Sequence, residues 1–391
     1  MQPFRPRSKR SFSPGVMAML GALGLLLAQA ASAQGCPFCS ALKPTLAQKQ
    51  NEAAWVGLAQ EVERTPAELL LRWLHQLKKP KGAPAAGENF AVPRRVVPAR
   101  GGPLWIVLGW KPAPGKNTPR WELIPGDELL YGYLVRAPGL RTPWPKRLRY
   151  FARFLEHPNP LVAEDAYQEF AHAPYEAVAQ VAPQLPPEKL RQWILDPEVI
   201  QARKGLYALL LALGAQDAAQ REQAAGFLQR ILVEQPDGFR SGLDGFIGAY
   251  LLAAGPAGLQ WVRRRWLAAP ESDPGIQRHL LRALEVLHQY GPRELRPGMA
   301  LCAQRLLDYP AVRTEAIRTL ARWQHWDSLP RLLALWEKTG RDDARLRRWI
   351  VGYLLLCPRP QARRKLEQIR KQHPGLVEQV QRGLLLLPPA Q

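Results

Sequence analysis

The chain has 391 residues, of which 54 are Lys or Arg and 33 are Asp or Glu, so its formal net charge is +21. An apolar content of 47% is enough for a substantial core and excludes wholesale disorder. The 30 Gly and 38 Pro exclude a collagen-like or low-complexity chain, and four Cys are too few for a disulfide scaffold. At roughly 100–200 residues per domain, the length suggests two or three domains.

Residues 1–33 have the order of features that a secretory signal peptide has. Basic residues come first, residues 16–28 carry no charge, and Ala31-Ser32-Ala33 then forms a small-x-small cleavage site. The uncharged run is too short for a spanning helix, which needs about 20 residues. A retained anchor and an acylated Cys36 are the less favoured alternatives. We expect an exported protein, periplasmic or extracellular, whose mature chain has no transmembrane segment.

Residues 34–145 predict a small β-rich domain. Short apolar runs alternate with breaks rich in Pro and Gly, as strands and turns do. Residues 66–79 are ambiguous, because their apolar residues have helical spacing although a strand would suit a barrel, and residues 78–87 indicate a loop. The expected strands span residues 53–59, 90–92, 95–97, 104–110, 121–124 and 129–135. Several short strands with turn signals predict a small barrel or sandwich.

Residues 146–391 contain about fifteen segments with helical periodicity and almost no strand signal. The stretch from Pro310 to Leu333 is similar to the HEAT-repeat pattern, and residues 160–166 are a weaker copy 150 residues earlier. HEAT units run about 40–47 residues, so this spacing fits three or four units. We expect an α-solenoid of about six helix pairs, with an irregular helical domain as the alternative. A solenoid leaves an extended surface for partners.

Cys36-Pro37-Phe38-Cys39 has the spacing of a thiol oxidoreductase active site, in which the first Cys begins a helix whose dipole lowers its pKa. Cys36 lies so close to the expected mature end that no strand can precede it. We therefore favour a structural disulfide between Cys36 and Cys39 over redox activity, with metal binding or acylation as further alternatives. Cys302 and Cys357 lie among apolar residues at helical spacing, which indicates buried free thiols.

The rest of the sequence gives no catalytic constellation, metal site or cofactor motif. The seven His have no metal-ligand spacing, and nucleotide-binding and hydrolase motifs are absent from the sequence. Glu164, Asp165 and Glu169 crowd one predicted helix, and we interpret them as a solvated face rather than as an acid–base pair. The protein is therefore expected to be non-enzymatic.

Positive charge concentrates at the end of the chain, where residues 341–391 hold 11 basic and 4 acidic side chains. A solvated face is the ordinary explanation, and a polyanion-binding surface is the functional one. The first helical stripe consists of Arg341, Arg345 and Arg348, and the second consists of Arg363, Arg364, Arg370 and Lys371. Because an exported protein rarely meets nucleic acid, acidic polysaccharide, anionic lipid headgroups or an acidic protein are the expected partners.

Several stretches resemble a family of exported bacterial proteins of unknown function. The matching stretches are residues 36–40, the run from Phe154 through Tyr175, Gly242-Leu243-Asp244-Gly245, Leu320-Ala321-Arg322-Trp323 with Trp326-Asp327, and Tyr353-Leu354 with Cys357-Pro358. The resemblance implies a mature chain that begins with CPFC, continues through a netrin- or OB-like barrel and ends in HEAT-like helices. It implies no reaction and no catalytic residue.

We therefore expect an α+β multi-domain protein with a signal peptide (1–33), a small netrin- or OB-like β domain (34–145) and a HEAT-like α-solenoid (146–391). Its expected function is binding or scaffolding of a protein or an acidic polymer of the cell envelope. The alternative function is a thiol–disulfide oxidoreductase that uses Cys36 and Cys39.

Overall fold

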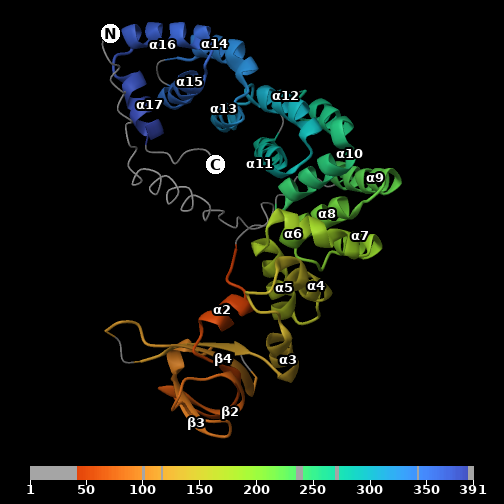
Figure 1. Ribbon diagram of the computed structural model, residues 1–391, viewed down its shortest axis with the longest axis vertical. Helices are drawn as coiled ribbons and strands as arrows, with labels where there is room; N and C mark the ends of the chain where they lie inside the picture. The colour runs from red at the N-terminus through yellow and green to blue at the C-terminus, as the bar shows by residue number, and fades with distance from the viewer. Residues whose placement is uncertain are drawn as a thin grey trace, which may run out of the picture. The chain divides into compact units, whose positions relative to one another are not determined.

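The computed structural model describes residues 42–98, 102–115, 118–234, 241–268, 273–340 and 343–385. The expected signal peptide and the CPFC motif lie outside these residues. The fold is α+β: a short helix, α2 (Leu46–Glu52), is followed by a five-stranded sheet and then by helices to the end of the described chain (Figure 1).

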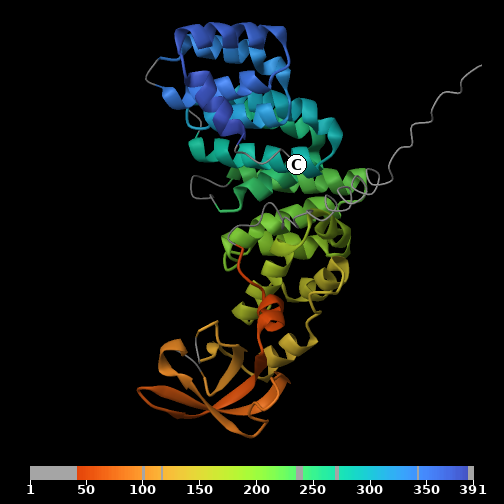
Figure 2. The ribbon, with the colours of Figure 1, turned by 60° about the vertical axis from the view of Figure 1, so that its left-hand side comes forward.

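The five strands form one curled antiparallel sheet, which is an open half-barrel (Figure 2). Its strands are β1 (Trp55–Arg64), β2 (Glu68–Lys78), β3 (Asn89–Pro93), β4 (Leu104–Trp110) and β5 (Arg120–Pro125). The spatial order is β3-β2-β1-β4-β5, so β1 is central and pairs with β2 and β4. The strands predicted around residues 53–59, 90–92, 104–110 and 121–124 are confirmed, and the ambiguous segment 66–79 is a strand.

Two expected strands are wrong. Residues 95–97 lie at a short 3₁₀ turn, η1 (Arg94–Val96), and residues 129–135 belong to helix α3 (Glu128–Arg136). The Asp127 side chain caps α3, because its Oδ1 accepts a hydrogen bond of 2.7 Å from the Leu130 N–H. The helix then buries Leu130, Tyr133 and Leu134, whose i, i+3, i+4 spacing is helical.

The sheet has a core on each of its faces. On one face Val56, Leu58, Ile106 and Leu108 join the core that continues into the helices. On the other face, residues of the same strands, such as Val107, pack inside the curl of the sheet. Because β4 is buried on both faces, its sequence is a continuous apolar run rather than an alternating one.

Fourteen further α-helices follow α3 within the described residues. They are α4 (Trp144–Phe151), α5 (Pro160–His172), α6 (Tyr175–Val181), α7 (Pro187–Leu195), α8 (Gln201–Gly214), α9 (Ala218–Glu234), α10 (Leu243–Trp266), α11 (Pro274–Tyr290), α12 (Arg296–Leu306), α13 (Arg313–Arg322), α14 (Leu329–Lys338), α15 (Ala344–Leu356), α16 (Pro360–Gln372) and α17 (Leu376–Leu385). Across the described part of the chain, no helix combines the length and apolar character that crossing a bilayer requires.

Helices α8 and α10 touch through glycine. A Cβ atom added to Gly245 of α10 would lie 2.9 Å from the Cα and carbonyl oxygen of Gly205 in α8. Gly242, which precedes α10, has a φ of 81°, a left-handed conformation that glycine adopts without strain. Positions 242 and 245 are therefore glycine because two helix backbones meet there.

Cys302 of α12 and Cys357, which follows α15, are buried and free, as the sequence predicted. Burial raises the pKa of the Cys302 thiol to about 12, so this cysteine is a packing residue rather than a nucleophile.

Candidate functional site

Six of the seven predicted polyanion-binding residues lie on helices α15 and α16, which contact each other. Cys36, Cys39 and Arg341 fall outside the described residues. Arg345 is exposed and lies 3.7 Å from Glu315 of α13. The remaining five basic residues are exposed and make no ion pair with any residue described in the structure; they are Arg348, Arg363, Arg364, Arg370 and Lys371. We call these five residues the C-terminal basic surface.

Helix α5 carries a polar stripe whose members are spaced i, i+1, i+4, i+5 and i+8, so they share one side of the helix. The stripe consists of Glu164, Asp165, Gln168, Glu169 and His172. The expectation that its acidic residues form a solvated face is wrong. Asp165 is 6% exposed and Glu169 is fully buried, while Glu164 is partly exposed.

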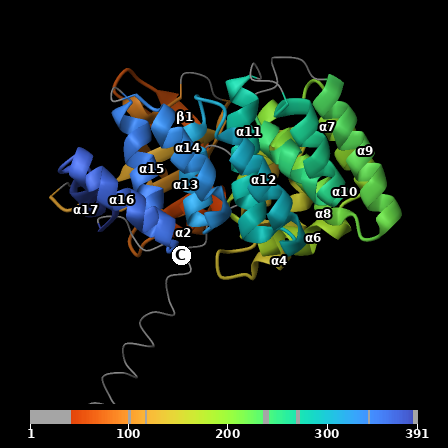
Figure 3. The ribbon, with the colours of Figure 1, turned by 90° about the horizontal axis from the view of Figure 1, so that it is seen from above.

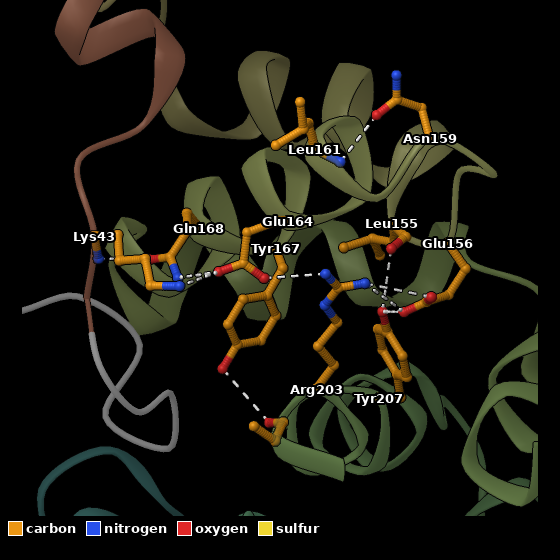
Figure 4. Close-up of polar contacts among 11 residues, drawn as sticks. Lys43, Leu155, Glu156, Asn159, Leu161, Glu164, Tyr167, Gln168, Arg203 and Tyr207 are labelled. Carbon is orange, nitrogen blue, oxygen red and sulfur yellow. Dashed lines mark hydrogen bonds and ion pairs between the residues drawn. The ribbon is translucent and has the colours of Figure 1, made fainter. Parts of the chain in front are cut away.

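Three members of the stripe make hydrogen bonds to the backbone of the segment that contains Lys43 and Leu46. The Lys43 N–H donates to Gln168 Oε1 at 2.9 Å, and the Lys43 carbonyl oxygen lies 2.8 Å from His172 Nε2. The Leu46 N–H donates to Asp165 Oδ1 at 2.6 Å. Figure 4 shows Lys43 beside Gln168 and Glu164. The stripe thus fixes the segment that follows the CPFC motif in the sequence.

A buried ion pair lies at the centre of this arrangement. Arg147 of α4 donates through its Nη2 to Glu169, and the two side chains are 3% and 0% exposed. Burial raises the pKa of Glu169, whereas the charge of Arg147 and a hydrogen bond from Thr45 act to lower it. Because charges are costly to bury, this pair depends on both partners being present.

Asp165 is also buried, and Tyr133 of α3 donates its hydroxyl to Asp165 Oδ2 at 2.7 Å. Burial raises the pKa of Asp165 to about 6, although the hydrogen bonds from Leu46 and Tyr133 favour its charged form. The neighbouring charge of Glu169 raises the pKa further, and that of Lys49 opposes this.

A second polar cluster joins α5 to α8 (Figure 4). Arg203 of α8 lies between two carboxylates, 3.4 Å from Glu156 and 3.0 Å from Glu164. The Tyr207 hydroxyl donates to the Glu156 carboxylate, and the Tyr167 hydroxyl lies 3.5 Å from the Ala202 carbonyl oxygen. These groups bind one another, so we interpret both clusters as structural.

Asp165 predicts a pH dependence of stability. The pKa of Asp165 is about 6 in the folded protein, whereas the ordinary pKa of an aspartate side chain is 3.8, so the unfolded chain releases this proton first as the pH rises. The stability contributed by protonated Asp165 is therefore full below about pH 4 and is lost between about pH 4 and pH 6. Asp165→Asn stays neutral, so its stability relative to wild type should rise by about 1–3 kcal/mol across this window. Urea unfolding at both pH values measures the change.

The exposed Glu198 supplies the control for this experiment. Glu198→Gln should show no comparable rise relative to wild type between the two pH values. An Asp165→Asn difference that stays constant from pH 4 to pH 7 would contradict the assignment.

Cavities among the described residues also lie elsewhere, and two of them are bordered by basic side chains. The first, of about 460 Å³, is bordered by Arg263, Arg264 and Arg305 in the helical region. The second, of about 500 Å³, lies on the sheet and is lined by residues that include Arg95, Trp110, Lys111, Arg120 and Trp121. We call the second the sheet cavity. No group of three or more His, Cys, Asp or Glu side chains within the described ranges is arranged to hold a metal ion.

Comparison with known proteins assigns this chain to no family. A scan against protein-family models matches none, and a search of curated proteins finds no significant match.

Sequence reasoning did not predict the sheet cavity. Residues 36–145 hold 15 basic and 8 acidic side chains, and this excess was the available signal, but Arg95, Lys111 and Arg120 lie in separate segments of the sequence. Their convergence depends on the β4–β5 register, in which Trp110 faces Arg120. The polar stripe had a clearer signal, namely the helical spacing of its five members.

Proposed function

We propose that this chain is an exported, non-enzymatic binding or scaffolding protein. Its helical part would form a HEAT-like α-solenoid that presents a surface to a protein or polyanionic partner of the cell envelope. The half-barrel would be a netrin- or OB-like domain at the start of the mature chain.

The order of contacts between helices supports the solenoid. Contacts join α10 to α11, α11 to α12, α12 to α13, α13 to α15 and α15 to α16, which are near neighbours in the chain. Figure 3 shows α13, α14 and α15 side by side. In a solenoid each repeat contacts its neighbours in this way. The strand order of the sheet supports the OB-like assignment, because it is the order of a five-stranded OB barrel opened between its third and fifth strands.

The C-terminal basic surface is the observation that carries the proposed function. At about 100° per residue, the four residues that α16 contributes to this surface (Arg363, Arg364, Arg370 and Lys371) fall within an arc of about 120° on one side of the helix. Glu367 lies on the same arc, so this side keeps a net positive charge. Unpaired cations on one face attract polyanions and raise their local concentration.

Removing this charge should weaken polyanion binding. The full chain is expected to bind immobilised polygalacturonate at low salt, and Arg363→Gln/Arg364→Gln/Arg370→Gln/Lys371→Gln should raise the dissociation constant about tenfold or more. Binding is measured by surface plasmon resonance at two salt concentrations, since screening weakens contacts between exposed charges.

The control removes the same number of exposed charges elsewhere. Lys79, Lys81, Arg230 and Arg278 are exposed and make no ion pair within the described residues. If their combined replacement by Gln weakens binding as much as the α16 variant does, the attraction is a property of total charge and the proposed surface is wrong. Absence of binding by the wild type would also contradict the proposal.

A further inference from the structure

The sheet cavity lies where two segments of the half-barrel meet. One segment is η1 with Pro93, and the other comprises the end of β4, the start of β5 and the described residues between them. The 3₁₀ turn contacts both β2 and β5, so it bridges strands that the sheet order keeps apart. The cavity measures about 500 Å³, which is within the range of small-molecule sites.

Three uncompensated cations line the sheet cavity. Arg95, Lys111 and Arg120 are exposed, no acidic side chain is among the lining residues, and none of the three forms an ion pair with a residue in the described ranges. Glu122, the acidic residue of β5, is 2.6 Å from Lys49 Nζ and is thus already paired. The charge of this cavity therefore favours an anion.

Arg120 is stacked on Trp110, and its guanidinium makes no side-chain hydrogen bond to any residue that the structure describes. Its guanidinium carbon lies 4.0 Å from the centroid of the Trp110 ring, on the strand that pairs with β5. A stacked guanidinium keeps the planar fork of N–H groups that binds a carboxylate or a sulfate through two oxygens. The Trp110 Nε1–H is buried and has no hydrogen-bond partner among the described residues.

The remaining lining is flat and apolar. Pro93, Val96 and Pro119 contribute aliphatic surface, and Trp121 contributes an indole that contacts Trp55 with ring centroids 5.3 Å apart. Such surfaces accept the C–H groups of a sugar ring, whose hydroxyl groups then point to the rim. A nucleic-acid base would find less free aromatic surface to stack on, because Arg120 covers one face of Trp110 and Trp121 packs against other aromatic rings.

We propose that the sheet cavity binds an acidic saccharide, with the carboxylate or sulfate on Arg120 and its basic neighbours and the sugar ring against proline and tryptophan. This site does not rest on the proposed function of the helices, because none of its residues lies in α15 or α16. The two sites can therefore fail separately.

Calorimetric titration of the full chain tests the site with defined probes: digalacturonate, a sulfated heparin disaccharide and the neutral disaccharide cellobiose. We expect at least one acidic disaccharide to bind at least tenfold more tightly than cellobiose. Arg120→Gln should weaken that binding about tenfold or more, because a charge-assisted bidentate contact is lost. The acidic probe that binds identifies a carboxylate or a sulfate as the preferred anion.

Two further variants separate the site from general charge. Lys111→Gln should weaken binding in the same direction, whereas Arg363→Gln on α16 should leave the disaccharide affinity unchanged. Circular dichroism verifies that each variant is folded; all three positions are exposed, so each change leaves the core intact.

The proposal is overturned if neither acidic disaccharide binds, if cellobiose binds equally well, or if Arg120→Gln and Arg363→Gln weaken binding equally. Tighter binding of a short oligothymidylate than of either disaccharide, lost in Arg120→Gln, would make the ligand a nucleic acid and would also overturn it. If the α16 variant loses polygalacturonate binding but keeps the disaccharide affinity of the wild type, the disaccharide binds at a site separate from α16, as proposed.

Discussion

Replacing Arg147 by Met should lower the free energy of unfolding by about 3–5 kcal/mol, because it leaves the Glu169 carboxylate buried without its cation. Arg147 is 3% exposed and Glu169 is fully buried, so water cannot substitute for the missing partner. Arg147 also lies over the Trp144 ring, with its guanidinium carbon 4.4 Å from the ring centroid, and Met fills only part of that space. Urea unfolding at pH 7, followed by circular dichroism, measures the loss.

Two companion variants show that the loss comes from the unpaired charge. Arg147→Met/Glu169→Leu should regain most of the lost stability, since replacing a whole buried pair by apolar groups is often neutral or stabilising. Glu188→Gln removes an ion pair whose carboxylate is 72% exposed, and it should cost less than about 1 kcal/mol. If the double variant is no more stable than Arg147→Met, the unpaired charge is not the cause.

Gly245→Ala should destabilise the protein by about 1–3 kcal/mol, although alanine is the better helix former. The new Cβ would lie 2.9 Å from backbone atoms of Gly205, and backbone cannot move aside as a side chain can. Helices α8 and α10 would have to separate, which would loosen the core between them. Thermal and urea unfolding measure the effect.

Gly226→Ala is the matched control, because Gly226 lies in α9 and an added Cβ would meet no atom within 4 Å. This variant should gain up to about 1 kcal/mol from helix propensity. Equal effects of the two substitutions would mean that the glycine contact between α8 and α10 has no energetic weight.

Much of the fold could be predicted from local pattern, and the errors have physical causes. The run at β4 was recognisable because burial on both faces removes every polar residue from it. The segment of β2 could not be decided, because Leu70, Trp73 and Leu74 have helical spacing while Leu69, Leu71 and Trp73 alternate. Pairing with β1 and β3 decides for the strand, and such pairing depends on residues elsewhere in the chain.

Helix α3 was mistaken for a strand because two local signals compete at its start. Asp127 follows Pro125-Gly126, which indicates a turn, yet its carboxylate begins a helix. The surroundings of the polar stripe and of the sheet cavity could not be predicted from local pattern, because they depend on contacts between distant segments. Glu169 resembles a surface residue until Arg147 is placed against it, and Arg120 resembles one until its register opposite Trp110 is known.

The hold of α5 on residues 43–46 also constrains the order in which the chain can fold. Leu46 and its partner Asp165 are separated by 119 positions, so the first residues of the described chain find their hydrogen bonds only after α5 has been made. At about 5–20 residues per second, synthesis of that interval takes about 6–24 s. Until α4 and α5 have been made, only α2 and α3, which contact β4 and β1, can cover the face of the sheet formed by Val56, Leu58, Ile106 and Leu108. The hydrogen bonds of Lys43 and Leu46 with α5 are therefore among the late contacts of the fold, because each closes a loop of more than a hundred residues.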